Sequence, residues 1–409
     1  MKILISSMTF APDHSGISLY ATDFATYATE QGHDVTVVTT FSWYPKWKKL
    51  PEDKRKLFRK EKYKKAKILR GYQYVPGNAS TKGRIIQEIT FLFFALFNFI
   101  RAGRQEVIVV FTPPINLGIL GIIFKKLWGA KLIINVQDLQ LDAAKSLGMV
   151  DKLPLIDFMH NIEKFTYRHS DLVTTISSAM IELVKNKGVH PDKLYLWPNW
   201  IDVDSAISKG EKGGFREKFP QYENKVIIGY AGNVGVKQGL STLIELSARY
   251  NAQNNISFLI IGEGGDLLNL KTMAEQMKIR NLEFIDFLSQ EDYFNFLSDA
   301  DLVFLSQKRD SGDVYFPSKL LGIMAKKKLI FVSADRESEL YKVIEDNDLG
   351  MLSDFEDIDQ MQICLDNFLE NQNKFTTNKS NAFNFVQQFD RNIVLKETFE
   401  KIKAIPQIL

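Results

Sequence analysis

Residues 301–326 (DLVFLSQKRDSGDVYFPSKLLGIMAK) place a lysine where a helix is expected to begin. Residues 302–306 form an apolar run long enough for a buried strand, and a polar loop then leads to Pro317, Ser318 and Lys319 before the helical sequence LLGIMA. Proline and serine are both common at helix starts. A cation in the first helical turn opposes the helix dipole at a cost of about 0.3–1 kcal/mol, and a bound anion reverses that cost. Lys319 is therefore either a solvated side chain or part of an anion-binding site.

A second lysine lies in residues 232–239 (GNVGVKQG), between an expected strand and an expected helix. The glycines and Lys237 fit a phosphate-binding turn around Asn233 and Gly235. The loop does not match the Walker A pattern, and glycine turns are common, so this signal is weak by itself. Because the carboxyl ends of parallel strands meet at one edge of a sheet, we expect this loop and Lys319 to lie together at a diphosphate site.

Residues that could bind a metal ion give a weaker pattern. Two aspartate pairs, Asp202 with Asp204 and Asp299 with Asp301, have a D-x-D spacing that binds a divalent cation in some transferases. Aspartate is also ordinary at turns, and the five histidines show no ligand spacing. We therefore expect no metal site.

The first half of the chain has its own candidate residues. Its opening loop, residues 7–16, contains a single glycine and not the G-x-G-x-x-G of a dinucleotide-binding fold. Gly16 stands just before an expected helix, where it either lets the backbone approach a ligand or simply makes a turn. His14, in the same loop, is either a site residue or a surface residue. Asp138 follows the expected strand 132–136 and is either a site residue at the carboxyl edge of the sheet or a helix cap.

Length and composition limit the class of protein. A chain of 409 residues that is 45% hydrophobic predicts a globular protein of two or three domains. Its one cysteine, Cys364, excludes a disulfide framework and fits a reducing compartment. The N-terminal sequence lacks the features of a signal peptide, and the most apolar run, residues 89–100, is shorter than the about 20 residues of a membrane span. We expect a protein that is soluble or lies on a membrane surface.

The positive charge is concentrated in residues 46–70. This segment holds 13 Lys or Arg and three acids, a local charge of +10, although the whole chain carries only +3. Aromatic residues are interleaved with these cations. The segment is either a solvated excursion or a surface that binds an anionic membrane, to which each cation contributes about 1 kcal/mol. Nucleic acid is not expected, because nothing else resembles a nucleic-acid-binding module.

Strand–loop–helix units occur in two series, which predicts an α/β fold of two parallel-sheet domains. The first domain is expected over residues 1–202 and the second over residues 225–380. The polar, glycine-rich residues 203–224 read as a linker. Residues 381–409 show helical periodicity and are expected to pack back on the first domain. Two such domains imply a cleft between them, where a ligand usually binds.

With these motifs in place, the chain resembles the retaining glycosyltransferases of family four, whose GT-B fold has two Rossmann-like domains facing across a cleft. The resemblance covers nearly the whole chain. It is carried by PNWID at 198–202, YAGNVGVKQG at 230–239, IIGEGG at 260–265, ADLVFLS at 300–306 and FPSKLLGIMA at 316–325. The phrases VQDL at 136–139 and FSWYP at 41–45 make it most similar to bacterial exopolysaccharide and O-antigen transferases, such as the colanic acid fucosyltransferase and fucosamine transferase type.

Two departures from the family pattern concern the donor site. The family's two glutamates before and within the central helix are replaced here by Val314 and Gly322. Asn233 takes the position of the usual arginine, and Lys237 stands one place early, beside Gln238. These changes leave open what holds the donor ribose.

The resemblance implies transfer of a sugar from a nucleoside-diphosphate sugar, a UDP-sugar or GDP-sugar, with retention of configuration and without a metal or other cofactor. Lys237 and Lys319 would offset the negative charge of the leaving diphosphate. The remaining residues expected around the donor follow strands of the second domain: Asn233, Gly235, Glu263, Gly264, Leu288, Pro317 and Ser318. Asp138, Gly16 and His14 are expected to face the acceptor or the transferred sugar.

The expected acceptor is a polyprenyl-diphosphate-linked saccharide used for surface polysaccharide such as capsule or O-antigen. Residues 41–70 and 89–100 would suit the anionic inner face of the plasma membrane, to which a cytoplasmic protein could attach peripherally. Two alternatives stay open. One is a nucleotide-sugar epimerase on a similar scaffold, and the other is a noncatalytic GT-B scaffold, which the two absent glutamates make conceivable.

Overall fold

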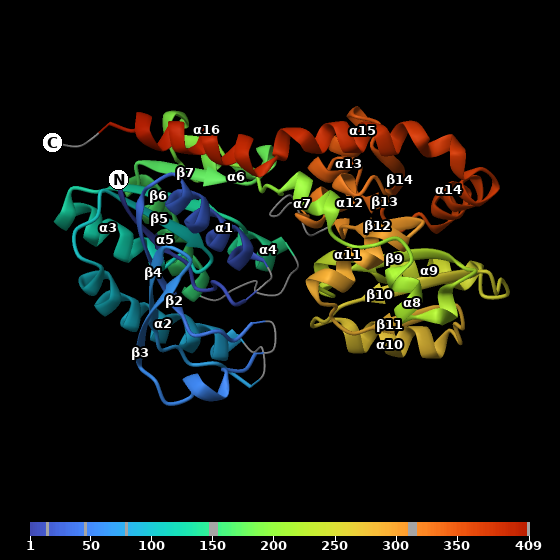
Figure 1. The fold of residues 1–409 in the computed structure, drawn as a ribbon, viewed down its shortest axis with the longest axis horizontal. Helices are drawn as coiled ribbons and strands as arrows, with labels where there is room; N and C mark the ends of the chain where they lie inside the picture. The colour runs from blue at the N-terminus through green and yellow to red at the C-terminus, as the bar shows by residue number, and fades with distance from the viewer. Residues whose placement is uncertain (14–15, 45–46, 78–80, 147–153, 310–316, 407–409) are drawn as a thin grey trace. The chain divides into compact units, whose positions relative to one another are not determined.

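The computed structural model describes residues 1–13, 16–44, 47–77, 81–146, 154–309 and 317–406 (Figure 1). The chain divides into two compact units. The first contains Met1–Asn199 and Leu395–Leu409, and the second contains Trp200–Val394. Each unit is built around one sheet.

The first unit contains an eight-stranded sheet with the order β3-β4-β2-β1-β5-β6-β7-β8. All neighbouring strands are parallel except β3, which runs antiparallel to β4 at the edge. The central strands are apolar and buried, as expected for parallel strands covered on both faces. The strands are β1 (Lys2–Ser6), β2 (Asp34–Thr40), β3 (Phe58–Tyr63), β4 (Ala66–Gly71), β5 (Val107–Thr112), β6 (Lys131–Val136), β7 (Leu172–Thr175) and β8 (Leu194–Leu196).

Helices pack on this sheet through aromatic and small residues. Phe99 of α2 contacts Phe124 of α3, with ring centroids 5.0 Å apart. Gly118 lets α3 approach α5, because a Cβ there would lie 2.1 Å from the Thr166 side chain. The helices are α1 (Ile17–Glu30), α2 (Thr81–Ala102), α3 (Leu117–Trp128), α4 (Gln140–Ser146), α5 (Pro154–His169), α6 (Ser178–Asn186) and the later part of α16 (Arg391–Ala404), with 3-10 turns η1 (Pro51–Asp53) and η2 (Pro191–Lys193).

The C-terminal segment is shared between the units. Phe399 of α16 stacks on Phe24 of α1 with ring centroids 5.2 Å apart, and the first unit takes the chain from Leu395 onward. Residues 381–394, which the sequence analysis grouped with this segment, belong to the second unit.

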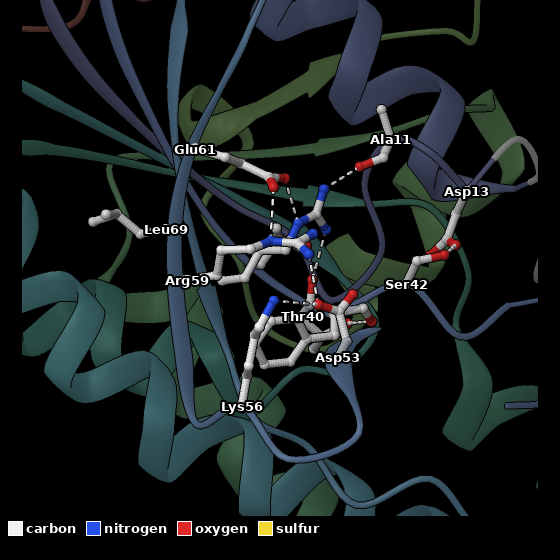
Figure 2. A network of polar contacts seen from close by, with 12 residues as sticks. Ala11, Asp13, Thr40, Ser42, Asp53, Lys56, Arg59, Glu61 and Leu69 are labelled. Atoms are coloured by element: carbon white, nitrogen blue, oxygen red, sulfur yellow. Dashed lines mark hydrogen bonds and ion pairs between the residues drawn. The ribbon is translucent and has the colours of Figure 1, made fainter. Parts of the chain in front are cut away.

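In the described part of the basic segment, residues 47–70, β3 and β4 extend the sheet, while most of the cations stay exposed to solvent. A partly buried ion-pair network holds the segment in place (Figure 2). Asp53 is fully buried and accepts a hydrogen bond of 2.5 Å from Arg59, and Glu61 pairs with Arg59 at 2.7 Å and with Arg70 at 2.6 Å. The excess cations of the segment therefore sit on an ordered sheet edge.

Helix α2 is also longer than expected. Residues 89–100 were expected to form an apolar run of limited length, but the helix spans 22 residues. Its part Lys82–Ala102 is long and apolar enough, by length and composition alone, to cross a membrane, and 28% of its most apolar stretch is buried inside the protein. The expectation that this segment is too short to span a bilayer was therefore wrong.

The second unit contains a six-stranded parallel sheet with the order β11-β10-β9-β12-β13-β14. Alternate residues of each strand enter two hydrophobic clusters, so that Ile227 belongs to one cluster and Ile228 to the other. This is the period of two that a strand covered on both faces produces. The strands are β9 (Val226–Ala231), β10 (Ile256–Ile261), β11 (Leu282–Ile285), β12 (Leu302–Ser306), β13 (Leu329–Ala334) and β14 (Gly350–Asp354).

Nine α-helices within the described part of the second unit and four short 3-10 turns surround this sheet. The helices are α7 (Val203–Ser208), α8 (Gly214–Lys218), α9 (Ser241–Arg249), α10 (Leu267–Gln276), α11 (Gln290–Asp299), α12 (Lys319–Ala325), α13 (Glu339–Asp346), α14 (Ile358–Glu370) and α15 (Thr376–Val386). The turns are η3 (Pro220–Tyr222), η4 (Val236–Gln238), η6 (Gln372–Phe375) and η7 (Gln387–Phe389).

Residues 203–224 are part of the second unit and not a linker. They form α7, α8 and η3, and Phe215 and Tyr222 are buried in its core. The carboxylate of Asp299 accepts hydrogen bonds from the backbone amides of Phe215 (2.9 Å) and Arg216 (3.0 Å). Asp301 pairs with the Arg216 side chain at 3.2 Å. The Asp299–Asp301 pair is thus structural, which agrees with its interpretation as an ordinary turn.

Candidate active site

Three loops meet at the carboxyl edge of the second sheet, after β9, β10 and β12. The amide of Val234 donates to the Glu263 carbonyl at 2.9 Å, which joins the first loop to the second. The amide of Lys308 donates to the Lys237 carbonyl at 3.0 Å, and the Ser306 hydroxyl donates to the Gln238 carbonyl. The expectation that these loops share one edge is therefore met by backbone contacts.

Two glycines make this close approach possible. A Cβ on Gly262, which has a φ of +134°, would lie 1.9 Å from the Gly232 carbonyl oxygen. A Cβ on Gly264 would lie 2.0 Å from the Val234 carbonyl oxygen. Side chains at these positions would push the loops apart, so the glycines are required for packing and not only for turns.

Lys319 reaches from α12 over the loop that follows β9. Its ammonium donates a hydrogen bond to the Tyr230 hydroxyl and lies 3.8 Å from the centroid of the Tyr230 ring. A Cβ on Gly232 would lie 2.4 Å from the Lys319 Nζ and would displace this ammonium, and the φ of +145° also favours glycine. Burial first, and the charge of Lys237 second, lower the pKa of Lys319 to about 7. The two lysines therefore lie close enough to repel each other, which is the arrangement that an anion between them would stabilise.

The amide groups of Asn233 and Gly235, which were expected to bind the diphosphate, contact another side chain of the same loop instead. The amide of Gly235 donates to the Gln238 side-chain oxygen at 3.0 Å, and the Asn233 side-chain amide lies 3.4 Å from the same oxygen. The Gly235 amide is thus occupied within the loop. Lys237 and Lys319 contribute ammonium groups at this edge that can bind a diphosphate.

The start of α12 also differs from the expected cap. Ser318 is the N-cap residue, but its side chain makes no capping hydrogen bond with the described residues, and Pro317 precedes it. Because α12 has only seven residues, its dipole is short. The charge of Lys319 is therefore more important here than the helix terminus.

At this edge of the second sheet, sequence reasoning missed the roles of Tyr230 and Gln238. Tyr230 is buried, and its hydroxyl donates to the Asn233 carbonyl while accepting from Lys319. Its position in an apolar strand suggested a core residue only. The signal that could have identified it is a hydroxyl-bearing ring placed one residue before the end of a strand, next to a glycine loop.

The other expected donor-side residues lie in loops of the same unit. Glu263 and Gly264 follow β10, and Glu263 is exposed. Leu288 follows β11 at the edge of the sheet and packs against the hydrophobic core. Of the two positions where the family has glutamates, Gly322 is buried near Tyr293, and Val314 lies outside the described residues.

In the first unit, Asp138 follows β6 and lines a cavity of about 30 Å³, with Glu88, Thr112 and Tyr167 among the other lining residues. Such a volume holds about one water molecule. Burial raises the pKa of Glu88 to about 7, although the charge of Arg84 opposes the shift. Asp138 therefore lies at the carboxyl edge of its sheet, beside a second carboxyl that sequence reasoning did not identify.

Contacts with Arg70 and Ser42 hold the opening loop of the first unit in place. Arg70, which is 2% exposed, donates to the Ala11 carbonyl and to the Thr40 carbonyl, the latter at 2.8 Å. Burial raises the pKa of Asp13 to about 6, against the hydrogen bond from Ser42, which lies across from it in Figure 2, and the charge of Arg70. These contacts fix the loop that leads to the candidate residue Gly16.

Gly16 is the N-cap residue of α1. It has a φ of +58°, and a Cβ there would meet open space, so the backbone conformation favours glycine while the position is accessible. His14 lies outside the described residues. Gly16 and Asp138 belong to the first unit, and the two lysines belong to the second.

One further polar cluster of the first unit was missed by sequence reasoning. Asp142, His160 and Glu163 bring possible ligand atoms within 4.8 Å of one another, as a metal site would require. However, Lys187 already pairs with Asp142 at 2.5 Å and with Glu163 at 2.6 Å. An ammonium thus supplies the positive charge at this position.

Comparison with known proteins agrees with the fold. Residues 15–200 match the family described as the glycosyl transferase 4-like domain, and residues 212–385 match the family of glycosyl transferases group 1. A protein of Escherichia coli described as the colanic acid biosynthesis glycosyl transferase WcaI is 29% identical over 352 residues, which are 84% of this chain and 86% of the relative.

Solved structures with the same fold cover the whole chain. Sucrose-phosphate synthase of Thermosynechococcus elongatus matches with a TM-score of 0.77 and 12% identity over 98% of both chains. Anabaena HepE in complex with UDP-glucose matches with a TM-score of 0.72 and 14% identity over 99% of this chain and 100% of that one. WaaG, described as a glycosyltransferase involved in lipopolysaccharide biosynthesis, matches with a TM-score of 0.71 and 14% identity over 98% of this chain and 100% of that one.

The expected fold class, two Rossmann-like sheet domains of the GT-B type, is thus confirmed. Each half of the chain matches one of the two families, and both halves occur together in a relative of similar length. The chain therefore consists of a glycosyl transferase 4-like domain followed by a domain of the glycosyl transferases group 1.

Proposed function

We propose that this glycosyltransferase moves a sugar from a nucleoside-diphosphate sugar to a polyprenyl-diphosphate-linked saccharide, with retention of configuration and without a metal ion. The observation that supports this proposal most directly is the pair of lysines, Lys237 and Lys319, at the carboxyl edge of the second sheet, where their charges act on each other. A buried cation beside a second cation is costly unless an anion binds between them. A diphosphate supplies that anion.

The chemistry follows from charge. As the bond between the anomeric carbon and the diphosphate oxygen breaks, negative charge grows on the leaving diphosphate. The two ammoniums stabilise that charge more strongly in the transition state than in the bound donor. An acceptor hydroxyl forms the new bond to the anomeric carbon on the face that the diphosphate leaves, and its proton passes to a phosphate oxygen.

The proposed donor is a UDP-sugar, with a GDP-sugar as the alternative. HepE was solved in complex with UDP and with UDP-glucose, and a trehalose-6-phosphate protein of Escherichia coli was solved with UDP-2-fluoro glucose. These proteins share the fold and little of the sequence. They favour uridine as the nucleoside of the donor but do not indicate which sugar is transferred. A panel of UDP-, GDP- and dTDP-sugars tested for thermal stabilisation identifies the donor, because ligand at 100 times its Kd adds about 2.7 kcal/mol.

The proposed acceptor is a lipid-linked saccharide of a surface polysaccharide, such as exopolysaccharide, capsule or O-antigen. The names of the relatives, colanic acid biosynthesis for WcaI and lipopolysaccharide biosynthesis for WaaG, support this class. The cationic sheet edge of the first unit supports peripheral attachment at the inner face of the plasma membrane. Asp138 and Gly16 are proposed to face the acceptor.

The test is the rate of sugar transfer by Lys319→Ala. We expect a loss on the order of 10²-fold or more, as for removal of one group that stabilises transition-state charge. Lys271→Ala, an exposed lysine of α10 in the same unit, is the control and should keep the wild-type rate.

Two outcomes favour the alternatives. Full activity of Lys319→Ala in cells would support a noncatalytic scaffold. Accumulation of a free epimeric nucleotide sugar, with the donor as the only substrate, would support an epimerase.

A further inference from the structure

Helix α2 has two apolar faces. One face is buried against β4 and β2 of the first unit: Phe91, Ala95 and Phe99 are fully buried along it. Gly71 of β4 permits the contact, because a Cβ there would lie 3.0 Å from Cβ of Phe94. This face explains why the helix belongs to the fold.

The opposite face carries a stripe of exposed apolar side chains, which we call the α2 stripe. Successive members are three or four residues apart, so they lie on one side of the helix. The members are Ile86 (48% exposed), Ile89 (58%), Phe93 (56%), Phe97 (42%) and Ile100 (61%). Scattered exposed apolar residues are normal, but a continuous row along a whole helix marks an interaction surface.

Cations lie near both ends of α2 and on the neighbouring strand. Arg84 near one end and Arg101 near the other each lie over an aromatic ring, Trp47 at 5.4 Å and Phe58 at 5.2 Å. The neighbouring edge strand β3 exposes Lys60 and Lys62. Aromatic contacts join this strand to the helix, since the Phe58 ring lies 5.3 Å from that of Phe94.

Acidic charge is scarce along α2. Its sequence contains a single acidic residue, Glu88, which lines the inner cavity with Asp138 and not the α2 stripe. An apolar row beside a cationic strand is complementary to the boundary between acyl chains and anionic headgroups.

We propose that the α2 stripe inserts into the headgroup region of an anionic lipid bilayer, with α2 parallel to the membrane plane. This inference rests on the proposed function, because it brings a lipid-linked acceptor to the protein. It goes further by naming the residues that enter the headgroup region. Insertion of these apolar side chains adds to the electrostatic attraction between the basic sheet edge and the anionic lipids.

The buried face of α2 argues against a membrane-spanning helix. Gln87 and Asn98 are buried, and Asn98 donates to the Leu69 carbonyl of β4 at 3.3 Å. A helix surrounded by lipid would lose the contact of Asn98 and place both side-chain amides in hydrocarbon. Only the outer half of the helix is available to lipid.

A second copy of the chain would cover the α2 stripe less favourably than a bilayer would. A symmetric dimer pairs a surface with itself, so it would bring together the basic edge strands beside the two copies of the α2 stripe. The exposed Lys60 and Lys62 of β3 would then add like charges to the interface. An anionic bilayer avoids this repulsion.

Flotation of the full-length protein with vesicles tests the proposal. The vesicles contain phosphatidylcholine with or without phosphatidylglycerol. The variant Phe93→Ser/Phe97→Ser should lower the bound fraction on anionic vesicles by about tenfold or more. The control variant Leu268→Ser/Ile363→Ser changes exposed apolar residues of the second unit (76% and 62% exposed) and should bind like the wild type. Circular dichroism and the thermal midpoint show that each variant is folded.

The outcomes separate this proposal from the enzymatic one. Loss of vesicle binding with unchanged sugar transfer to a water-soluble acceptor supports the α2 stripe. Equal vesicle binding by wild type and the Phe93→Ser/Phe97→Ser variant overturns it, as does a wild-type dimer that this variant dissociates. Resistance of the bound protein to alkaline extraction would also overturn it, because that indicates a spanning helix. Vesicle binding without any transferase activity would leave the α2 stripe standing and refute the proposed function.

Discussion

At the scale of single residues, the candidate site depends on Lys319 and the groups that hold it. The Tyr230 hydroxyl accepts from its ammonium and donates to the loop carbonyl of Asn233, so Tyr230 links the cation to the loop. Gly232 leaves space for the lysine side chain. Sequence reasoning identified the lysine and the glycine from their types and spacing. It could not identify the tyrosine, because its contacts depend on a strand and a helix that are 89 positions apart in the chain.

Removal of that hydroxyl tests the role of Tyr230 as a positioning residue. Tyr230→Phe keeps the ring beneath the ammonium and removes one hydrogen bond to it. We expect kcat/KM to fall by about tenfold, as for the loss of about 1–1.5 kcal/mol, and the pH profile to shift. Tyr250→Phe, whose hydroxyl bonds Asp366 at 2.7 Å away from the loops, is the control. An unchanged rate and an unchanged pH profile in Tyr230→Phe would refute this role.

The lowered pKa of Lys319 predicts how donor binding depends on pH. A bound diphosphate favours the protonated amine and raises a pKa that is about 7 in the free protein. Above pH 7, the amine of Lys319 therefore takes up a proton when the diphosphate binds. The affinity of the protein for the diphosphate falls by up to about tenfold per pH unit as the pH rises above 7. Isothermal titration with UDP from pH 6 to about 9 measures this slope. The same slope in Lys319→Gln would assign it to another group.

At the scale of elements, the site is a junction of loops whose spacing is set by glycine. Gly262→Ala would place a Cβ 1.9 Å from the Gly232 carbonyl at a φ of +134°. We expect a loss of about 2–4 kcal/mol in the free energy of unfolding, with weaker donor binding. Gly265→Ala, where the added Cβ meets nothing within 4 Å, is the matched control. Urea unfolding of the two variants compares them, and equal stability would contradict the backbone packing described here.

Elements that are buried on both faces were predictable from the sequence. The apolar runs of β1, β5, β9, β10 and β12 have this pattern, and each forms a strand of one of the two sheets. The polar strand β3 was not predictable, because it is ordered by its pairing with β4 and by the ion pairs of Arg59 with Asp53 and of Glu61 with Arg70. Residues 203–224 were misread for a similar reason, since α8 is capped by Asp299, which lies far away in the sequence.

At the scale of the whole molecule, the division of charge matches the division of roles that we propose. The segment with a local charge of +10 lies in the first unit, beside α2 and its exposed stripe. The two lysines proposed for the diphosphate lie in the second unit. Repetition of the strand–helix pattern predicted two domains of one class. The side chains that form each site are set by contacts between loops. The periodicity of hydrophobic residues carries no information about these contacts.

The most direct test of the central claim is equilibrium binding of UDP and UMP, or of the guanosine pair if the donor panel selects it. We predict that wild type binds the diphosphate more tightly than the monophosphate. Lys237→Ala and Lys319→Ala should each weaken diphosphate binding by about 10- to 100-fold and reduce the difference between the two ligands, while Lys271→Ala should behave like wild type. Variants of Lys237 and Lys319 that bind the diphosphate as tightly as wild type would contradict the account.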